Sequence, residues 1–493
     1  MLSSSFLLGV IALYFVLLYV VSHFTSKQAT NETFFLADKQ SSWVMVAIGM
    51  IGATLSGVTF ISIPGVVGDG GVNQSFSYMQ MVFGYMVGYF IIATVLMPIY
   101  YKYNLTTIYT YLEKRFGKVS RKTGSGFFML SRIIGAALRL YLVAIVFQTI
   151  IGSKAGIPFW LIVALTIALI WVYTFRGGIK TIVWTDTLQT ACMVIAVVVS
   201  IWVLSSELNI SIFEIPTIIK ENNLSQWFYF ENGWSDPNNF YKQFISGALM
   251  ALVMTGLDQD MMQKNLTCRS LKEAQMNMGL FSFILIFANI LFLSLGAMLY
   301  IYANSKGIEI PEKTDQLYPI LAIEHLGPVV AVTFVLGMIA AAYSSADSAL
   351  TALTTAFCVD FLNFESTEIE EEEKKRKRIM VHVGFSLILF CVILAFNSLN
   401  NKAVITGLFT AAGYTYGPIL GLFTFGILHK VNIRDHLVWV VCLLCPILSY
   451  AINLNSAEWL GGLEFGFLIL AVNGLLTYLG LWIISIRNSF NEA

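Results

Sequence analysis

Long uninterrupted apolar runs constrain the fold of this chain more than any other feature. About 20 consecutive apolar residues cross a bilayer as one helix. Hydrophobic residues make up 57% of the 493 residues and charged residues only 12%, which is outside the range of soluble domains. We therefore expect an all-α integral membrane protein with about thirteen transmembrane helices. The runs lie near residues 3–23, 42–66, 74–100, 125–151, 156–175, 180–205, 239–262, 277–303, 319–361, 379–397, 403–427, 434–453 and 461–486.

Two of these runs need separate comment. The run 319–361 is too long for one simple crossing, so we expect a short external helix around Tyr318–His325 and a crossing that begins after Gly327-Pro328. The first six residues lack the positive charge of a cleaved signal peptide. The first span is therefore expected to be retained.

The distribution of basic residues predicts the orientation of the chain, because cytoplasmic loops carry an excess of Lys and Arg. With the N-terminus outside, internal loops and the tail hold 21 of the 29 Lys and Arg residues, Lys264 among them, and the external side holds six. Arg132 and Arg139 lie inside the fourth span. The pattern predicts a multi-pass protein of the plasma (inner) membrane with its C-terminus in the cytoplasm.

Charge balance and side-chain patterns argue against several other functions. Lys plus Arg and Asp plus Glu both number 29, so the charge gives no basis for nucleic-acid binding. The six Cys and five His residues show no metal-site spacing, and no catalytic constellation has a workable spacing. We expect no enzyme activity and no organic cofactor. The expected partners are a small solute and membrane lipid, with no obligate protein partner.

The stretch Ala340–Thr355, AAAYSSADSALTALTT, carries a column of oxygen atoms inside an apolar run. At 100° per residue, Ser344, Ser348 and Thr351 share one helix face and Ser345 lies beside them. Oxygen ligands without nitrogen or sulfur suit a hard cation such as sodium. Close helix packing is the alternative explanation for small hydroxyl residues. It does not explain Asp347, because a carboxylate in mid-membrane costs roughly 2.5–3.5 kcal/mol and indicates a functional site.

The second run is poor material for a continuous helix. It reads MIGATLSGVTFISIP over Met50–Pro64, with two glycines, four hydroxyl residues and a proline. Unwound backbone at membrane depth is tolerated only where it lines a cavity or is buried in protein. A break near Ser56-Gly57 would free the carbonyls around Gly52–Leu55 for a cation. Packing against a neighbouring helix through small residues is the alternative.

The two arginines of the fourth span carry the one clue to the charge of a ligand. Arg132 and Arg139 are seven residues apart and share one helix face. A guanidinium at this depth needs a partner. That partner is either a protein carboxylate, such as Asp186 or Asp258, or an anionic substrate.

Six segments together resemble one known family. They are TNETFFLADKQSSWV (30–44), ATLSGVTFISIPG (53–65), RGGIKTIVWTD (176–186), DQDMMQKNLTCRSLKEAQ (258–275), AAAYSSADSAL (340–350) and GYTYGPILGLF (413–423). In this order they are similar to the sodium:solute symporter family, whose members carry sugars, proline, pantothenate and sialic acid. The resemblance covers nearly the whole chain and specifies the family, not the substrate.

The resemblance implies a core of two inverted five-helix repeats with broken helices, an amino-acid/sodium symporter-type core. The repeats would span 42–205 and 239–427, with one extra N-terminal span at 3–23 and two extra C-terminal spans at 434–486. It also implies a sodium site between the second and ninth spans. Its ligands would be the carbonyls of Gly52, Leu55 and Ala341 and the hydroxyls of Ser344 and Ser345.

The same resemblance suggests an ion route or second ion site at Asp186, Asp347 and Ser348. Asp347 departs from the Ser or Thr of several members, which leaves the number of ions open. The solute pocket implied by the resemblance lies above sodium and is bounded by Ser56, Thr59, Gln80, Asp258, Gln259, Arg139 and either Tyr414 or Tyr416. Asp258 stands where sugar carriers have Asn. Sialic acid carriers have an arginine at the position of Gly135.

These features predict a sodium-coupled secondary active symporter that imports a small polar organic solute by alternating access. Sugar, sialic acid, carboxylate and amino-acid-like solutes all remain candidates, and Arg139 favours a carboxylate-bearing or polyhydroxy one. One alternative is proton coupling through Asp347 or Asp186. The other is a membrane receptor that binds solute without accumulating it.

Overall fold

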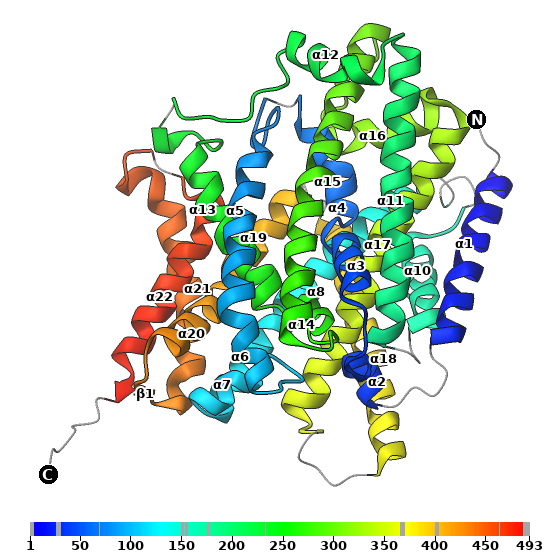
Figure 1. Ribbon diagram of the computed structural model, residues 1–493. Coiled ribbons are helices and arrows are strands. Elements are labelled where there is room, and N and C mark those ends of the chain that lie inside the picture. The colour runs from blue at the N-terminus through cyan, green and yellow to red at the C-terminus, as the bar shows by residue number, and fades with distance from the viewer. Residues whose placement is uncertain are drawn as a thin grey trace, which may run out of the picture.

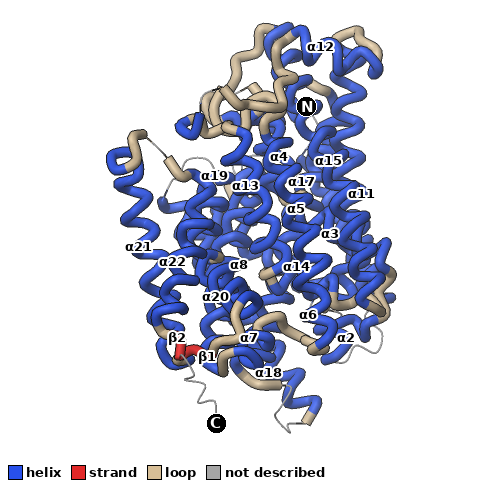
Figure 2. The backbone as a smooth tube through the Cα atoms, turned by 60° about the vertical axis from the view of Figure 1, so that its left-hand side comes forward, coloured by secondary structure: helices blue, strands red, loops and turns tan. Residues whose placement is uncertain are grey.

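Helices that run roughly along one common axis make up almost the whole structure (Figure 1). The computed structural model describes residues 4–25, 31–68, 70–148, 152, 156–174, 178–231, 233–364, 370–399, 404–462 and 464–486. In Figure 1, α12 marks the upper end of this bundle and α7 marks the lower end. Figure 2 shows that the loops gather at these two ends and that helices fill the region between them.

The described residues of the first half of the chain form ten α-helices. They are α1 (Ser4–Thr25), α2 (Asn31–Leu36), α3 (Trp43–Thr54), α4 (Gly57–Val66), α5 (Tyr78–Ile91), α6 (Met97–Lys102), α7 (Thr110–Arg115), α8 (Lys118–Phe147), α10 (Phe159–Thr174) and α11 (Ile179–Glu207).

The second half contributes the remaining described helices and one short pair of strands. The helices are α12 (Ile215–Glu221), α13 (Phe240–Ala251), α14 (Gln259–Asn265), α15 (Leu271–Lys306), α16 (Leu317–Ile320), α17 (Gly327–Ala356), α18 (Glu371–Leu399), α19 (Val404–Thr415), α20 (Gly417–Leu428), α21 (Val438–Trp459) and α22 (Ile469–Ile483). Strands β1 (Asn432–Ile433) and β2 (Ser485–Ile486) pair antiparallel at the lower end.

Single π-helical and 3-10 turns extend or join several of these helices. The π turns are η2 (Ile92–Leu96), η6 (Leu252–Gly256), η8 (Leu321–His325) and η9 (Phe357–Phe361). The 3-10 turns are η1 (Ala37–Lys39), η4 (Ile212–Glu214), η5 (Gly233–Ser235), η7 (Thr314–Gln316), η10 (Asp435–Leu437) and η11 (Gly466–Leu468).

The helices follow the predicted apolar runs closely. Within the described ranges, nine helices are long and apolar enough to cross a membrane, and two bent pairs raise this to as many as 11. The runs 156–175 and 403–427 contain shorter apolar helices, Phe159–Trp171 and Gly417–Leu428. The all-α membrane fold is therefore confirmed.

The long ninth run folds as its sequence predicts. A short helical segment, α16 with the π turn η8, covers Leu317–His325, and α17 begins at Gly327 with Pro328 in its first turn. Proline is favoured there because its missing N–H is not needed in the first turn of a helix. Most of the lower half of α17 is buried, including Ser344, Asp347 and Thr351.

Helices α5 and α13 approach each other most closely through glycines. A Cβ atom at Gly88 would lie 2.6 Å from the carbonyl oxygen of Ala248, and one at Gly84 or Gly247 would overlap the backbone of the facing helix even more. Small residues allow such close backbone contact between membrane helices, where dispersion replaces the hydrophobic effect as the main attraction. Because α13 continues through η6 to a sharp bend before α14, this contact fixes the chain just ahead of that bend.

Gly247→Ala tests this contact. The added methyl group would meet the backbone of Met81, so we expect it to lower the free energy of unfolding by about 1–3 kcal/mol. Thermal denaturation of the purified protein measures the effect. Gly279→Ala is the matched control, because no atom lies within 4 Å of a Cβ atom there. Equal stability of the two variants would contradict the packing described here.

Candidate sodium and solute site

The first half of the site is the break between α3 and α4. Leu55 has φ −77° and ψ 66°, Ser56 is extended with φ −69° and ψ 173°, and the two helical segments are bent by 60°. The predicted break is confirmed, although it lies one residue earlier than Ser56-Gly57. The local sequence TLSGVT explains it. Ser and Thr side chains can hydrogen-bond the backbone in non-helical conformations, and glycine loses more backbone entropy in a helix than other residues do.

The break leaves carbonyl oxygens free. The Leu55 N–H still donates to the Ile51 carbonyl, and the chain resumes helical bonding when the Phe60 N–H donates to Ser56. Within the described part of the chain, no donor reaches the carbonyls of Gly52 or Leu55. Buried carbonyls without partners are costly in a membrane protein unless a ligand or water satisfies them.

Helices α11 and α17 lie directly beside Gly52. A Cβ atom at Gly52 would lie 3.4 Å from Ser344 Oγ and 3.1 Å from the Asp186 carbonyl oxygen, and closest of all to Thr190 Oγ1. Only glycine fits at this contact. The structure therefore brings together the unwound segment and the hydroxyl-bearing helix, as the sequence predicts.

The hydroxyl and carboxylate oxygens of α17 make several hydrogen bonds in this region. Ser344 Oγ donates to Asp186 Oδ1 at 2.7 Å, and Ser345 Oγ donates to the Ala341 carbonyl at 3.3 Å. Two residues after Ser345, Asp347 Oδ1 accepts from the Ser348 N–H at 2.6 Å. All of these side chains are buried.

Lys264 occupies a position that the sequence analysis did not foresee. The prediction that it lies in an internal loop is wrong, because Lys264 is in α14 with only 1% of its surface exposed. Its Nζ donates to Asp186 Oδ2 at 2.6 Å. The prediction failed because this part of the chain folds into the short helix α14. There Lys264 is buried and forms an ion pair with Asp186, whereas a loop would leave its charge in water.

A second break separates α13 from α14. The segment Phe240–Gly256 and α14 are bent by 68° at Leu257 and Asp258. Asp258 begins α14, since its Oδ1 accepts from the N–H groups of Asp260 and Met261. Its Oδ2 accepts from the Tyr416 hydroxyl. A carboxylate at a helix N-terminus is stabilised by the orphan N–H groups and the helix dipole.

Arg132 is paired with this second break. Its Nη1 lies 3.6 Å from Asp258 Oδ2, and its Nη2 contacts Asp260 Oδ2. Of the two protein carboxylates proposed as partners for the arginines, Asp258 therefore pairs with Arg132 and Asp186 pairs with Lys264.

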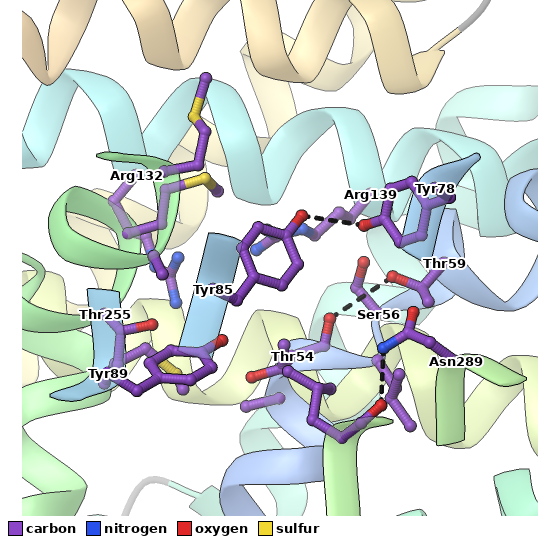
Figure 3. Close-up of a pocket in the computed structure, with 17 residues that line it drawn as sticks. Thr54, Ser56, Thr59, Tyr78, Tyr85, Tyr89, Arg132, Arg139, Thr255 and Asn289 are labelled. Atoms are coloured by element: carbon purple, nitrogen blue, oxygen red, sulfur yellow. Dashed lines mark hydrogen bonds between the residues drawn. The ribbon is translucent and has the colours of Figure 1, made fainter. Parts of the chain in front are cut away.

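A cavity lies between the two breaks. It contains about 820 Å³ of space not filled by protein atoms, counting the solvent at its mouth. Figure 3 shows its polar side chains, which come from α3, α4, α5, α8, the turn η6 and α15. They are Thr54, Ser56, Thr59, Tyr78, Tyr85, Tyr89, Arg132, Arg139, Thr255 and Asn289. Met250, Met254 and Met261 contribute an apolar part of the wall.

Arg139 differs from every other buried basic group of this region. It lines the cavity and is only 6% exposed, yet its Nε and Nη1 have no hydrogen-bond partner. Across the described residues, no carboxylate forms an ion pair with it. An unpaired guanidinium in a buried cavity is stable only if an anion or ordered water completes it.

The hydroxyl groups of the cavity form a partial network. Tyr78 and Tyr85 share a hydrogen bond of 3.0 Å, and Thr59 Oγ1 donates to the Thr54 carbonyl at 3.4 Å (Figure 3). Asn289 donates one bond to the Leu285 carbonyl of its own helix. The cavity therefore offers phenol, hydroxyl and amide groups beside one unpaired cation.

Several residues predicted to bind solute lie elsewhere. Ser56, Thr59 and Arg139 line the cavity. Gln80 bonds the Asn238 carbonyl and the Tyr229 N–H of the upper loop, and Gln259 bonds the backbone of Thr106 and Ile108. Asp258 begins α14, and the Tyr414 ring packs against Tyr450. These four do not line the cavity.

The sequence analysis missed the three tyrosines of α5. Tyr78, Tyr85 and Tyr89 are spaced by seven and four residues and therefore lie on one helix face. That spacing within an apolar run is a signal that could have found them. Asn289, an isolated amide in the apolar α15, is another.

Two broken helices with a cavity between them, and backbone carbonyls left free at one break, are the arrangement expected of a secondary transporter. Comparison with known proteins agrees. The model of the sodium:solute symporter family, SSF, matches residues 34–434. The chain belongs to the sodium:solute symporter family, whose members couple solute transport to sodium.

Among its relatives, the chain is 26% identical to the sodium/sialic acid symporter NanT of Aliivibrio fischeri, covering 86% of this chain and 83% of that protein. It is 25% identical to the sodium/sialic acid symporter SiaT of Proteus mirabilis, covering 89% and 88%. Human sodium-coupled monocarboxylate transporter 1 is 25% identical over 81% of this chain and 65% of its own length.

Two solved structures share the fold. A substrate-bound, outward-open Na+-coupled sialic acid symporter superposes with a TM-score of 0.80 at 22% identity and covers 97% of both chains. Mhp1, a nucleobase-cation-symport-1 family transporter, gives 0.58 at 13% identity, covering 93% of this chain and 95% of that one. The protein is a secondary active symporter with the sodium-symporter fold.

Gly52→Ala tests the contact between the break and its neighbours. The methyl group would push α3 away from Thr190 and Ser344, so the variant should lose the stabilisation that sodium gives the wild-type protein. Thermal unfolding in NaCl against choline chloride measures it. Thr190→Ala removes the nearest atom, and we expect the double variant to recover part of the sodium effect. An unchanged sodium effect in Gly52→Ala alone would contradict this geometry.

Proposed function

We propose that this symporter imports a small solute that bears a carboxylate and several hydroxyl groups, together with sodium bound at the α3–α4 break. The unpaired guanidinium of Arg139 in the cavity is the observation that carries the proposal. A planar carboxylate matches the fork of N–H donors that a guanidinium presents. The tyrosine, threonine and asparagine groups around it suit hydroxyl groups of the same solute.

Sodium is proposed to bind the carbonyls of Gly52, Leu55 and Ala341 and the hydroxyls of Ser344 and Ser345. The two carbonyls of the break have no donor within the described residues, both hydroxyls are buried, and Ser344 Oγ lies beside Gly52. Because Ser344 donates its only proton to Asp186, its lone pairs are available to a cation. Five oxygen ligands without sulfur or nitrogen suit a hard monovalent ion.

The unwound segment couples the ion to the solute. Residues 53–56 line the cavity, and the adjoining Gly52 lies against Ser344 and Asp186, where the ion site is proposed. Sodium would hold this segment in the conformation that completes the cavity, so each ligand raises the affinity of the other. Rocking of the two repeats, 42–205 and 239–427, would then expose the site to the other side.

The relatives support this substrate class. NanT and SiaT are sodium/sialic acid symporters, and a further relative is a sodium-coupled monocarboxylate transporter. Sialic acids and monocarboxylates both carry a carboxylate. Arg139 lies one helical turn from Gly135, which suggests that the carboxylate is held from the same helix at a different height.

We also propose that the upper end of the bundle faces outward. The basic segments around α7 and the start of α18 lie at the lower end, while α12 lies at the upper end (Figure 1). Basic loops remain in the cytoplasm. A membrane potential of 100 mV, negative inside, would then add about 2.3 kcal/mol to the uptake of each sodium ion.

Replacing both Ser344 and Ser345 with Ala removes two of the five proposed ligands. We expect the sodium concentration for half-maximal thermal stabilisation to rise by at least about tenfold, which corresponds to about 1.4 kcal/mol. Titration of NaCl at constant ionic strength with choline chloride measures it. Thr333→Ala is the control, because its hydroxyl bonds only its own helix and is partly exposed. A sodium response unchanged in the double variant would place the ion elsewhere.

Arg139→Gln tests the substrate class. In a thermal-shift screen, carboxylate solutes should stabilise the wild-type protein more strongly in sodium than in choline, and the variant should bind the best of them at least about tenfold more weakly. Arg139→Lys should recover only part of the loss, since an ammonium cannot make two parallel bonds. The methyl ester of the same solute is the matched control ligand. If the ester and the acid bind equally well, Arg139 does not hold a carboxylate.

A further inference from the structure

Lys264 and Asp186 form a buried ion pair at the edge of the proposed sodium site. The lysine side chain is 1% exposed and the aspartate is fully buried, with 2.6 Å between Nζ and Oδ2. Neither the solute cavity nor the five proposed sodium ligands include Lys264. A charge that is so costly to bury, and that contacts neither ligand directly, calls for its own explanation.

Both oxygens of the Asp186 carboxylate are occupied by donors of the protein itself. Oδ1 accepts from Ser344 Oγ at 2.7 Å, and Oδ2 accepts from Lys264 Nζ. Ser344 in turn is one of the proposed sodium ligands. The ammonium of Lys264 therefore contacts the carboxylate oxygen of Asp186 that Ser344 leaves free.

The backbone that carries Lys264 is tightly fixed. The neighbouring Gln263 donates to the Phe35 carbonyl at 2.7 Å and to Thr355 Oγ1 at 3.0 Å, and Thr267 Oγ1 donates to the Lys264 carbonyl at 2.7 Å. These bonds join α14 to α2 and α17. The ammonium is thus held in position rather than carried on a free loop.

We propose that the Lys264 ammonium takes the place of a second coupling ion at Asp186, so that the protein binds a single sodium. This inference rests on the sodium coupling proposed above. A sodium ion at Asp186, Asp347 and Ser348 would share a carboxylate with a fixed ammonium, and like charges at such short range repel strongly in a buried site. Asp186 is then a positioning residue. It accepts the Ser344 proton, so that the lone pairs of the Ser344 oxygen can face the one bound ion.

Removal of the ammonium should create the second site. In Lys264→Met, a side chain of similar length without charge, Asp186 keeps its bond from Ser344 but loses its counter-charge. Ser348 lies one helical turn from Ser344 on α17, and its Oγ has no hydrogen-bond partner at present. Carboxylate and hydroxyl oxygens would then be free to bind a second sodium ion.

Equilibrium binding of 22Na+ to the full-length purified protein in lipid nanodiscs, with choline chloride as the balancing salt, tests the proposal. We expect one sodium ion per wild-type protein and two per Lys264→Met protein. Lys264→Arg keeps the positive charge and should bind one. In the double variant Lys264→Met/Asp186→Asn, the new site should be lost and the count should return to one.

The outcomes separate this proposal from the function on which it rests. Two sodium ions on the wild-type protein would overturn the role of Lys264 and leave sodium coupling intact, and this count needs no variant. One ion on Lys264→Met with unchanged affinity would also overturn it. No saturable sodium binding to the wild-type protein would instead contradict the proposed ion site itself.

Discussion

Within the hydrocarbon region, every buried charge and every backbone carbonyl needs a partner, and this constraint organises the structure around its site. Most such groups near the two breaks are satisfied by the protein: Lys264 pairs with Asp186, and Arg132 pairs with Asp258 and Asp260. Some groups in the described part of this region have no partner from the protein, among them the carbonyls at the α3–α4 break and two guanidinium nitrogens of Arg139. We propose that a cation binds these carbonyls and that an anion binds Arg139.

The two proposed ligands carry opposite charges. Residues 53–56 line the same cavity as Arg139, and the adjoining Gly52 lies against Ser344. A cation and an anionic solute bound there would together bring little net charge into the membrane. Under this proposal, a change in these residues caused by one ligand would alter the binding of the other, so coupling would need no long pathway through the protein.

The extent to which the sequence predicts the structure differs between the two breaks. The density of glycine, hydroxyl residues and proline in α3 and α4 indicates the first break directly, and apolar length places the spans. The break at Leu257 and Asp258 has only one nearby glycine, so composition does not indicate it. From the sequence alone, Asp258 could be a solute ligand as well as the first residue of a helix. Gln80 and Gln259 illustrate the same difficulty. A buried amide that satisfies a neighbouring backbone cannot be told from a ligand until the fold shows what it bonds.

The partners of the buried basic residues were also hard to predict from the sequence. Arg132 and Arg139 look alike in the sequence, and only the position of the second break shows that one is paired and the other is not. Lys264 looks like an ordinary loop residue, because the residues that bury it come from helices far away in the chain. Local composition therefore predicts where the backbone must be irregular. The partners of buried polar groups depend on contacts between distant segments.

The central claim is that sodium binds where the α3–α4 break meets α17. A high-resolution density map of the protein in NaCl, compared with one in choline chloride, tests it most directly. The account predicts density for an ion between the carbonyls of Gly52 and Leu55 and the hydroxyl of Ser344, present only in sodium. Identical maps in the two salts, or sodium-dependent density at another place, would contradict it.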